Sequence, residues 1–229
     1  MVDVMSAEST VSTDVKYLDK DDRYFAHARP EMVEMLPGDA KVLLDVGCST
    51  GRFGQLAKET RPNLEEVWGI ELHRESAMQA EEVLERVVVG GVPEALDSIP
   101  DEYFDCVVFN DVLEHLADPE EVLAIVKSKL RPGGYVVASI PNMREFQTLS
   151  KLIFRGSWEY QDSGILDRTH LRFFTESSIK NMFARLGFEM EEMKGINRNW
   201  RRLPRFLNLI SGGLISDTLF LQFAVRAKV

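Results

Sequence analysis

Two short segments contain the residue types that could carry out acid–base or metal chemistry. The segment "NDVLEHL" holds Asp111, Glu114 and His115, and the segment "GILDRTHLRFF" holds His170. If the first segment turns helically, its three side chains share one face at positions i, i+3 and i+4. An imidazole at such a place could accept the proton of a bound hydroxyl group.

We expect His170 and His115 to act as proton acceptors without a metal ion. The alternative is a divalent cation held by Asp111, Glu114, His115 and His170, since carboxylates and imidazoles together suit such ions. A third interpretation assigns no chemistry to these residues. In it, Glu114 and His115 brace the loop before a helix cap at Asp118, and His170 is a packing residue.

A glycine-rich segment, "LLDVGCSTGRFG", connects a predicted buried strand to a predicted helix. Such connections lie at the carboxyl edge of a parallel sheet, where open α/β folds bind ligands. A dinucleotide fingerprint needs G-x-G-x-x-G, but Ser49 stands where its second glycine should be. The glycines here are Gly47, Gly51 and Gly54, and no Gly-Lys-Ser/Thr of a P-loop follows. The spacing therefore disfavours a dinucleotide, and with it a dehydrogenase.

An acidic residue, Glu71, ends the next predicted strand, "WGIEL". It lies about 20 residues after Gly51, a spacing at which a carboxylate can accept hydrogen bonds from ribose hydroxyls. Alone, such an acid would more often be a solvated strand end or a helix cap. Together with the glycine loop, it indicates a nucleoside-binding site.

Strands and helices alternate along most of the chain, which predicts βαβ units and a mostly parallel sheet. We expect residues 1–14 to be a loose tail and residues 15–229 to form a single domain. Residues 142–174, which lie between the fifth predicted strand and the last two, lack sustained periodicity. A connection of that length is often a lid. Strands are predicted at "KVLLDVG", "EEVWGIEL", "VVVGG", "YFDCVVFND", "YVVASIP", "FEMEEMKGI" and "TLFLQFAVRAKV", and helices at "RFGQLAKET", "RESAMQAEEVLERV", after Asp118 and from Thr175 to Gly187.

The composition narrows the function classes. The 229 residues carry a formal net charge of −10, which argues against nucleic acid as a partner because that needs a basic surface. The two cysteines suggest neither a metal site nor a redox pair, and the N-terminus lacks the order of a secretion signal. No apolar run reaches the roughly 20 residues of a membrane span. We therefore expect a cytoplasmic protein with a small-molecule partner, and leave its oligomeric state open.

In their order along the chain, the motifs resemble those of class I S-adenosylmethionine-dependent methyltransferases. The resemblance rests on "LLDVGCSTGRFG", Glu71, "FDCVVFNDVLEHLADP" and "LRPGGYVVASIPN", and covers about residues 24–195. It implies an α/β, Rossmann-like doubly wound sheet of seven strands in the order 3-2-1-4-5-7-6. The last strand would be antiparallel, and a lid would be inserted after strand 5. It also implies S-adenosylmethionine as cofactor and S-adenosylhomocysteine as product.

The resemblance further implies roles for individual cofactor-binding residues. The motif positions place four residues around the methionine part of the cofactor, with Asn110 beneath it. Apart from the motifs, Tyr24 and Arg29 precede the first of them and are expected to close over the cofactor carboxylate. Glu71 would hold the ribose, and Leu72 would pack on the adenine. Gly91 stands where the family often has an adenine-binding aspartate, so the backbone at Gly91 and Val92 is expected to take that part. The four residues around the methionine part are Asp45, Gly47, Cys48 and Gly51.

The segment "DRTHLRFFT" is similar to part of the methyltransferases of polysaccharide and glycan biosynthesis, and to the lid of ubiquinone-biosynthesis O-methyltransferases. This similarity implies O-methylation of a small molecule such as a sugar or glycan-biosynthesis intermediate, with Arg172 and Glu114 contacting it. N- or C-methylation, RNA methylation and cofactor binding without catalysis remain the alternatives. The small-RNA 2′-O-methyltransferases carry a similar Glu-x-x-Glu-His run, from which this sequence departs at Asp111 and Leu116.

Overall fold

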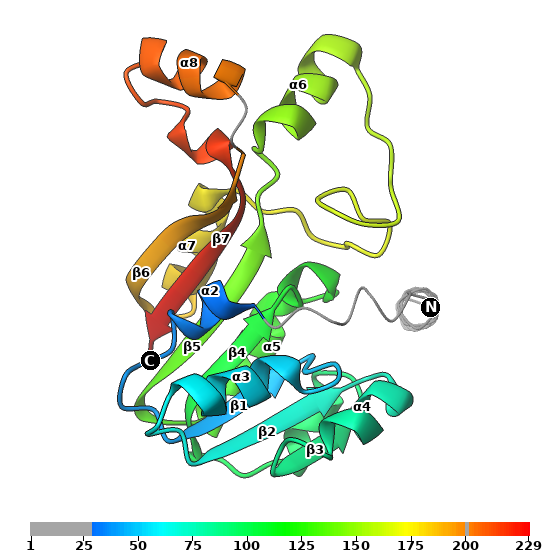
Figure 1. Cartoon of the computed structure of the whole chain (residues 1–229), viewed down its shortest axis with the longest axis vertical. Coiled ribbons are helices and arrows are strands. Elements are labelled where there is room, and N and C mark those ends of the chain that lie inside the picture. Colours follow the sequence, from blue (N-terminus) through cyan, green and yellow to red (C-terminus); the bar gives the residue numbers. More distant parts are fainter. Residues whose placement is uncertain (1–28, 200–201) are drawn as a thin grey trace.

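Seven strands form one sheet in the computed structural model, which describes residues 29–199 and 202–229 (Figure 1). They are β1 (Val42–Val46), β2 (Glu66–Glu71), β3 (Arg86–Val89), β4 (Phe104–Asn110), β5 (Leu130–Pro141), β6 (Glu189–Arg198) and β7 (Phe220–Lys228). Their order is β3-β2-β1-β4-β5-β7-β6. Strands β1 to β5 pair in parallel, whereas β7 is antiparallel to β5 and β6. These findings confirm the predicted fold class and strand order.

Helices cover both faces of this sheet. They are α2 (Pro30–Val33), α3 (Arg52–Thr60), α4 (Arg74–Ala80), α5 (Pro119–Lys129), α6 (Phe146–Arg155), α7 (Glu176–Arg185) and α8 (Arg202–Ile210), with 3₁₀ turns η1 (Glu94–Ser98), η2 (Leu113–His115) and η3 (Ser216–Leu219). Every residue of β1 is buried. Successive side chains of a strand point to opposite faces of the sheet, and helices cover both faces here. Val42 and Leu44 pack in a core with α5 and α7, and Leu43 packs in a second core with α2 and α3.

The predicted helix in "RESAMQAEEVLERV" is shorter in the structure. Helix α4 ends at Ala80, and turns connect it to β3. The Glu85 backbone N–H already donates to the carbonyl oxygen of Val67 in β2, at 3.1 Å. Leu84 is buried in the core beneath the glycine loop. Pairing with the sheet therefore overrides the helix propensity of these residues.

Two helices, α6 and α8, were not predicted. Helix α6 begins where Oε2 of Glu145 accepts hydrogen bonds from the N–H groups of Gln147 and Thr148, and it ends at Gly156 with φ 60°. None of the residues of α6 is buried. Helix α8 follows β6 and precedes η3. Both helices project beyond the strand ends at the top of Figure 1.

The segment predicted to be a lid leaves the sheet after β5 and returns at Phe174. There Asn142 and Phe174 form an isolated parallel bridge, and the Met143 N–H donates to the carbonyl oxygen of Phe174 at 2.8 Å. Thr175 then caps α7 as predicted, with Ser178 completing a capping box. The proposed tail, Tyr24 and all other residues before Arg29 lie outside the described residues. No helix within the described residues is both long enough and apolar enough to cross a membrane.

Candidate active site

The glycine-rich loop after β1 turns back over the end of β2. The N–H groups of Gly47 and Cys48 both donate to the carbonyl oxygen of Ile70, at 2.8 and 3.0 Å. Gly47 has φ 74° and Gly51 has φ 77°, in the left-handed region that favours glycine. A Cβ atom on Gly47 would lie 2.7 Å from Cγ2 of Val112. The loop can therefore lie this close to the segment after β4 because it carries no side chain there.

The Glu71 carboxylate links this loop to the start of α4. Its Oε2 atom accepts a hydrogen bond from the Ser49 N–H and its Oε1 atom one from the His73 N–H, both at 2.8 Å. The side chain is buried, and burial raises the pKa of Glu71 although these two hydrogen bonds oppose the shift. The carboxylate is thus fixed at the end of β2, where the sequence predicts the ribose contact.

Two adjoining cavities open at this edge of the sheet. Their volumes are about 390 and 110 Å³, and both are lined by Gly47 and Asp111. Among the predicted cofactor residues, the larger cavity is lined by Arg29, Asp45, Cys48 and Asn110, and the smaller one by Glu71, Leu72, Gly91 and Val92. This division fits a cofactor with an amino-acid part and a nucleoside part. Gly51 lines neither cavity but is buried at the start of α3.

Buried polar atoms at the larger cavity have no hydrogen-bond partner within the described residues. Among them are Oδ1 of Asp45 and both side-chain polar atoms of Asn110. Burial, and the nearby Glu71 carboxylate, raise the pKa of Asp45 well above its usual range. Since buried polar groups normally have partners, these atoms suit a ligand that brings its own donors and acceptors. The amino-acid part of S-adenosylmethionine has such groups.

The remaining cofactor predictions differ in how closely their side chains approach the cavities. Leu72 faces Gly91 across the smaller cavity, since a Cβ atom on Gly91 would lie 3.6 Å from Cδ1 of Leu72. The Cys48 thiol instead packs beneath the loop, where a Cβ atom on Gly69 would lie 2.4 Å from its Sγ. Burial raises the pKa of the Cys48 thiol, which fits a small packing residue better than a nucleophile.

Arg29 lies at the mouth of the larger cavity and binds the residue that follows β4. Its guanidinium forms a short ion pair with Asp111 and donates to Oε1 of Gln222 at 3.2 Å. The Asp111 N–H and its Oδ1 atom also pair with the Ser139 hydroxyl, each at 3.1 Å. These contacts hold Asp111 where it lines both cavities together with Gly47 of the glycine-rich loop.

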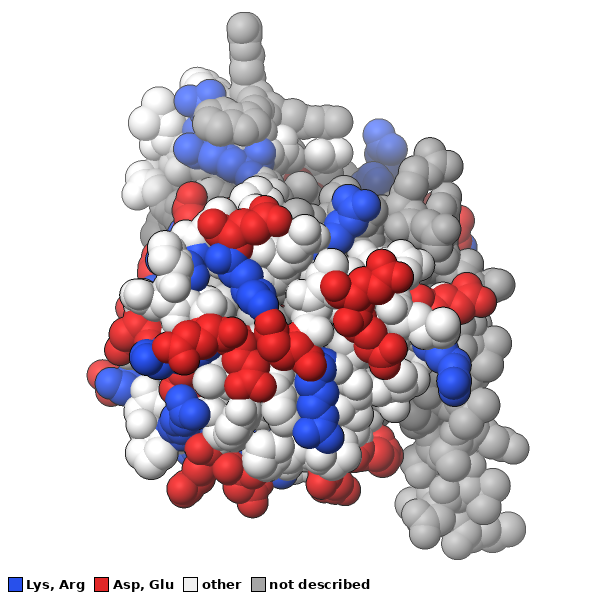
Figure 2. Space-filling model, turned by 60° about the horizontal axis from the view of Figure 1, so that its bottom comes forward, with Lys and Arg blue, Asp and Glu red and all other residues white. Residues whose placement is uncertain are grey.

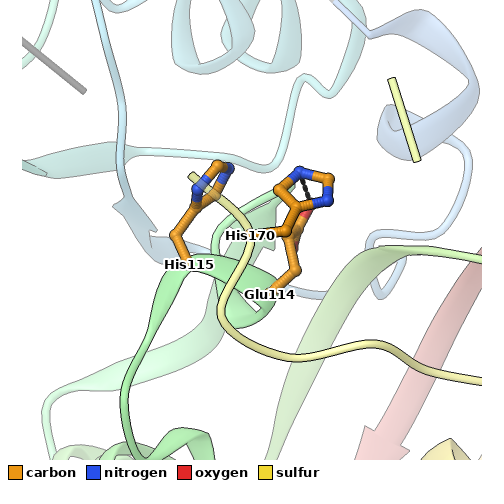
Figure 3. A group of neighbouring side chains, drawn as sticks. All are labelled: Glu114, His115 and His170. Atoms are coloured by element: carbon orange, nitrogen blue, oxygen red, sulfur yellow. Dashed lines mark ion pairs between the residues drawn. The ribbon is translucent and has the colours of Figure 1, made fainter. Parts of the chain in front are cut away.

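Three of the four chemistry-bearing residues predicted from the sequence meet beside the two cavities, Glu114 and His170 lining the larger one and His115 the smaller one. Figure 3 shows Glu114 and His115 from η2 beside His170 from the segment after α6. The rings of His115 and His170 have centroids 4.8 Å apart, and Nε2 of His170 lies 4.0 Å from Oε1 of Glu114. One ligand atom from each residue lies within 4.8 Å of the others, and Asp111 is not part of this group.

Backbone carbonyl groups fix the tautomers of both imidazoles. Nδ1 of His115 lies 3.2 Å from the carbonyl oxygen of Thr169, and Nδ1 of His170 lies 3.0 Å from that of Ile165. A carbonyl oxygen accepts but cannot donate, so each Nδ1 carries the proton and each neutral ring keeps its lone pair on Nε2. An Nε2 lone pair can accept a proton or bind a metal ion.

The Glu114 carboxyl group is buried beside the His170 ring. Its side chain is 1% exposed, and neither carboxyl oxygen has a hydrogen-bond partner within the part of the chain that the structure describes. Burial, followed by repulsion from Asp111, raises the pKa of Glu114 well above its ordinary value. Its backbone carbonyl accepts the N–H groups of Leu171 and Arg172, at 2.8 and 3.0 Å. Glu114 thus anchors the His170 segment to η2.

Arg172 has an exposed side chain whose guanidinium donates to the carbonyl oxygen of Ala117. It lines neither of the two cavities, so its contact with an acceptor stays a prediction. Gln222 was not predicted from the sequence, but it lines the larger cavity and binds both Arg29 and Asp111. No local motif marks Gln222, because it reaches the site only through the pairing of β7 with β5.

Comparisons with known proteins agree with this geometry. Residues 17–193 match a family described as a methyltransferase domain. The ubiquinone biosynthesis O-methyltransferase of Chromobacterium violaceum is 28% identical over 169 residues, which is 69% of this chain and 69% of that protein. A solved S-adenosylmethionine-dependent methyltransferase from Archaeoglobus fulgidus is 25% identical, with a TM-score of 0.56 over 82% of this chain and 86% of that chain.

A further solved structure supports the fold alone. It is a 1,6-didemethyltoxoflavin-N1-methyltransferase from Burkholderia thailandensis with bound 1,6-didemethyltoxoflavin and S-adenosylhomocysteine. Its identity is 17% and its TM-score 0.65, over 100% of this chain and 91% of that chain. Two curated relatives, from Streptomyces fradiae and Schizosaccharomyces pombe, are 33% and 32% identical over shorter segments. The chain spans 41% and 44% of their lengths.

Proposed function

The chain belongs to the methyltransferase-domain family and uses S-adenosylmethionine, and from this premise we propose that it methylates a hydroxyl oxygen of a small molecule. A sugar or another intermediate of glycan biosynthesis is the preferred acceptor. The name of the Chromobacterium violaceum relative, an O-methyltransferase, supports oxygen as the methylated atom. The observation that carries the proposal is the His170 imidazole, which lines the larger cavity with its Nε2 lone pair beside Glu114.

Different residues of the chain contact different parts of the cofactor in this proposal. Asp45 and Asn110 offer buried polar atoms to its amino-acid part, and Glu71 offers its carboxylate to the ribose. Leu72, Gly91 and Val92 form the apolar walls of the smaller cavity around the adenine. When bound, S-adenosylmethionine supplies a methyl group on a sulfonium, a leaving group that needs no further activation. The protein therefore mainly aligns the acceptor.

His170 accepts the proton that the acceptor hydroxyl must lose. Its Nδ1–H donates to the Ile165 carbonyl, so Nε2 is the proton acceptor. The resulting imidazolium lies 4.0 Å from the Glu114 carboxyl group, which can stabilise the positive charge when ionised. His170 would take the O–H proton as the acceptor oxygen gains the methyl group that the cofactor would supply, with a neutral thioether as the leaving group.

Residues 142–174 act as the lid in this proposal, within one domain spanning residues 15–229. Ser163, Gly164, Ile165 and His170 come from this segment and line the larger cavity. The lid is held to η2 by hydrogen bonds to Glu114 and His115. Its closure would exclude water from the transferred methyl group.

The test is to identify the product. The full chain is incubated with S-adenosylmethionine and a panel of sugars, phenols, amines and activated carbon acceptors, and the methylated atom is located by NMR. An O-methyl ether is the expected product. Exclusive methylation of nitrogen or carbon, or tight binding of S-adenosylhomocysteine without turnover of any acceptor, would contradict the proposal. A bare RNA that is bound and methylated would revive the RNA alternative.

A second candidate is a divalent cation on Glu114, His115 and His170. The clustering of their ligand atoms within 4.8 Å favours it, as do the two Nδ1–H groups on backbone carbonyls, which is how metal-binding histidines are commonly oriented. Metal bonds near 2.1 Å would draw the three ligand atoms closer together. A strong chelator that leaves turnover unchanged excludes this candidate. Loss of turnover that added metal restores would support it over His170 as the base.

A further inference from the structure

Helices α6 and α8 expose apolar side chains to an unusual extent. Phe154 of α6 is 83% exposed and Leu209 of α8 is 77% exposed, and Leu214, just after α8, is 83% exposed. Both helices project from the same end of the molecule, beyond the carboxyl end of β5 (Figure 1). We call the surface made by α6, α8 and residues 211–216 the apical surface. Large exposed apolar surfaces of this kind normally mark a place of interaction.

The apolar residues of α8 follow a helical stripe. Leu203, Phe206, Leu207 and Ile210 stand at positions i, i+3, i+4 and i+7, and all four are exposed. On a helix packed against its own domain, such a stripe would face the core. Here it faces outward, so α8 is amphipathic with its apolar side unpartnered within the described structure. Ile153 and Phe154 extend the apical surface on α6.

The apical surface is also basic, in contrast with the rest of the chain. Residues 146–155 and 202–216, which make this surface, contain no Asp or Glu, although the whole chain has a net charge of −10. Figure 2 shows a side turned away from this end, where acidic side chains lie across the middle and along the lower edge. The basic side chains that the structure describes on this surface are Lys151 and Arg155 of α6 and Arg205 of α8. This charge distribution complements an anionic surface.

The combination of exposed apolar and basic side chains points to one kind of partner. A second copy of the chain, docked through the same surface by a two-fold axis, would place basic side chains against basic side chains, and these segments contain no carboxylate of their own to pair with them. A nucleic acid would pair with the arginines but not with exposed Leu and Ile. An interfacial helix on an anionic bilayer uses both, with its apolar side among the acyl chains and its basic side at the headgroups.

We propose that the apical surface docks the protein onto an anionic lipid bilayer, with α6 and α8 lying in the plane of its surface. This goes beyond the proposed methyl transfer and does not depend on it. Helix α6 belongs to the same segment, residues 142–174, as Ser163, Ile165 and His170, which line the larger cavity, so docking would hold this segment at the bilayer.

The first experiment is flotation of the full chain with vesicles of phosphatidylcholine mixed with phosphatidylglycerol, or of phosphatidylcholine alone. We expect the protein to float with the anionic vesicles at low salt and to dissociate as salt screens the charges. The double variant F154S/L209S should lower the partition coefficient by roughly tenfold or more for each apolar residue lost. The control is Met78→Ser, since Met78 is 60% exposed on α4 at another part of the molecule.

The second experiment separates charge from apolar contact. The variant K151Q/R155Q on α6 should weaken binding to anionic vesicles by about fivefold per charge removed. The variant K180Q/R185Q removes two exposed charges from α7 and should leave binding unchanged. Failure of the native chain to bind anionic vesicles overturns the proposal, and so does equal loss in both variants. Self-association that F154S/L209S abolishes, without vesicle binding, would identify a second copy as the partner instead.

Discussion

Nε2 of His170 lies 4.0 Å from Oε1 of Glu114, and both side chains are buried although they come from separate parts of the chain. The carboxyl group is enclosed so fully that burial raises the pKa of Glu114 well above 4.5. An imidazolium formed at His170 would favour the ionised carboxylate and so lower that pKa. The proton states of the two residues are therefore linked, which suits a pair that takes up and releases one proton in each turnover.

Replacing His170 with Asn should lower kcat by about 100-fold or more, the usual contribution of a positioned general base. The affinity for S-adenosylhomocysteine should change little, because the predicted cofactor contacts come from other residues. The measurement is steady-state turnover at saturating acceptor, together with calorimetry of S-adenosylhomocysteine binding.

The matched control for this variant is Arg168→Gln. Arg168 lies in the same segment, but its side chain is exposed and pairs with Asp162. The Arg168→Gln variant should therefore keep native turnover. Undiminished kcat in His170→Asn would remove the base from the proposed mechanism, and an equal loss in both variants would indicate a disturbed lid instead.

Much of the fold could be predicted from the sequence because its signals are local. Apolar runs such as "KVLLDVG" that close on glycine mark strands buried on both faces, and the structure places β1 there with every residue buried. The caps at Asp118 and Thr175 set the starts of α5 and α7. Helix α4 was predicted too long, because the pairing of Glu85 with β2 is a tertiary contact that no local pattern contains.

The missed elements have a common physical cause. The apolar residues of α6 and α8 face outward. Their spacing therefore does not mark a side of the helix that packs in the domain core. Within the site, the glycine loop and Glu71 follow from spacing, and the structure brings them together through the Ser49 N–H. The contacts of Arg29 with Asp111 and Gln222 depend on where three distant segments meet. Contacts between distant segments can be identified only in the folded structure.

Replacing Glu71 with Ala should weaken S-adenosylhomocysteine binding by on the order of 100-fold, since hydrogen bonds to a charged group contribute about 1.5–3 kcal/mol each. The substitution also releases the N–H groups of Ser49 and His73 that the carboxylate now holds. Calorimetry measures the change, with Glu75→Ala as the control because Glu75 is exposed on α4. Native affinity in Glu71→Ala would contradict the assignment of this cavity to the cofactor.

Replacing Gly47 with Ala should destabilise the protein by about 1–3 kcal/mol, the usual cost of a strained left-handed residue and an overpacked contact. Gly47 has φ 74°, and the added Cβ atom would lie 2.7 Å from Cγ2 of Val112. Gly38→Ala is the control, because a Cβ atom there would meet nothing within 4 Å. Urea denaturation compares the variants, and equal stability of the two would show that the loop tolerates a side chain.

Glu114→Gln should make the protein more stable at neutral pH, and the gain should disappear in acid. Because the folded-state pKa of Glu114 is raised above its ordinary value of 4.5, the folded protein holds a proton that the unfolded chain releases. The free energy of unfolding of the native protein therefore falls as pH rises above about 4.5, by at most about 1.4 kcal/mol per pH unit, until the folded-state pKa is reached. Glutamine has nearly the same shape but no proton to lose, so the variant lacks this loss of stability.

Urea denaturation of both proteins across a pH series measures this difference directly. The control is Glu59→Gln, since Glu59 is exposed on α3 and should leave the pH dependence of the native protein in place. Two stability curves that run parallel at all pH values would mean that Glu114 titrates normally in the folded state. Its carboxyl group would then have to be hydrated or paired, and the buried Glu114–His170 pair could not have the linked protonation argued above.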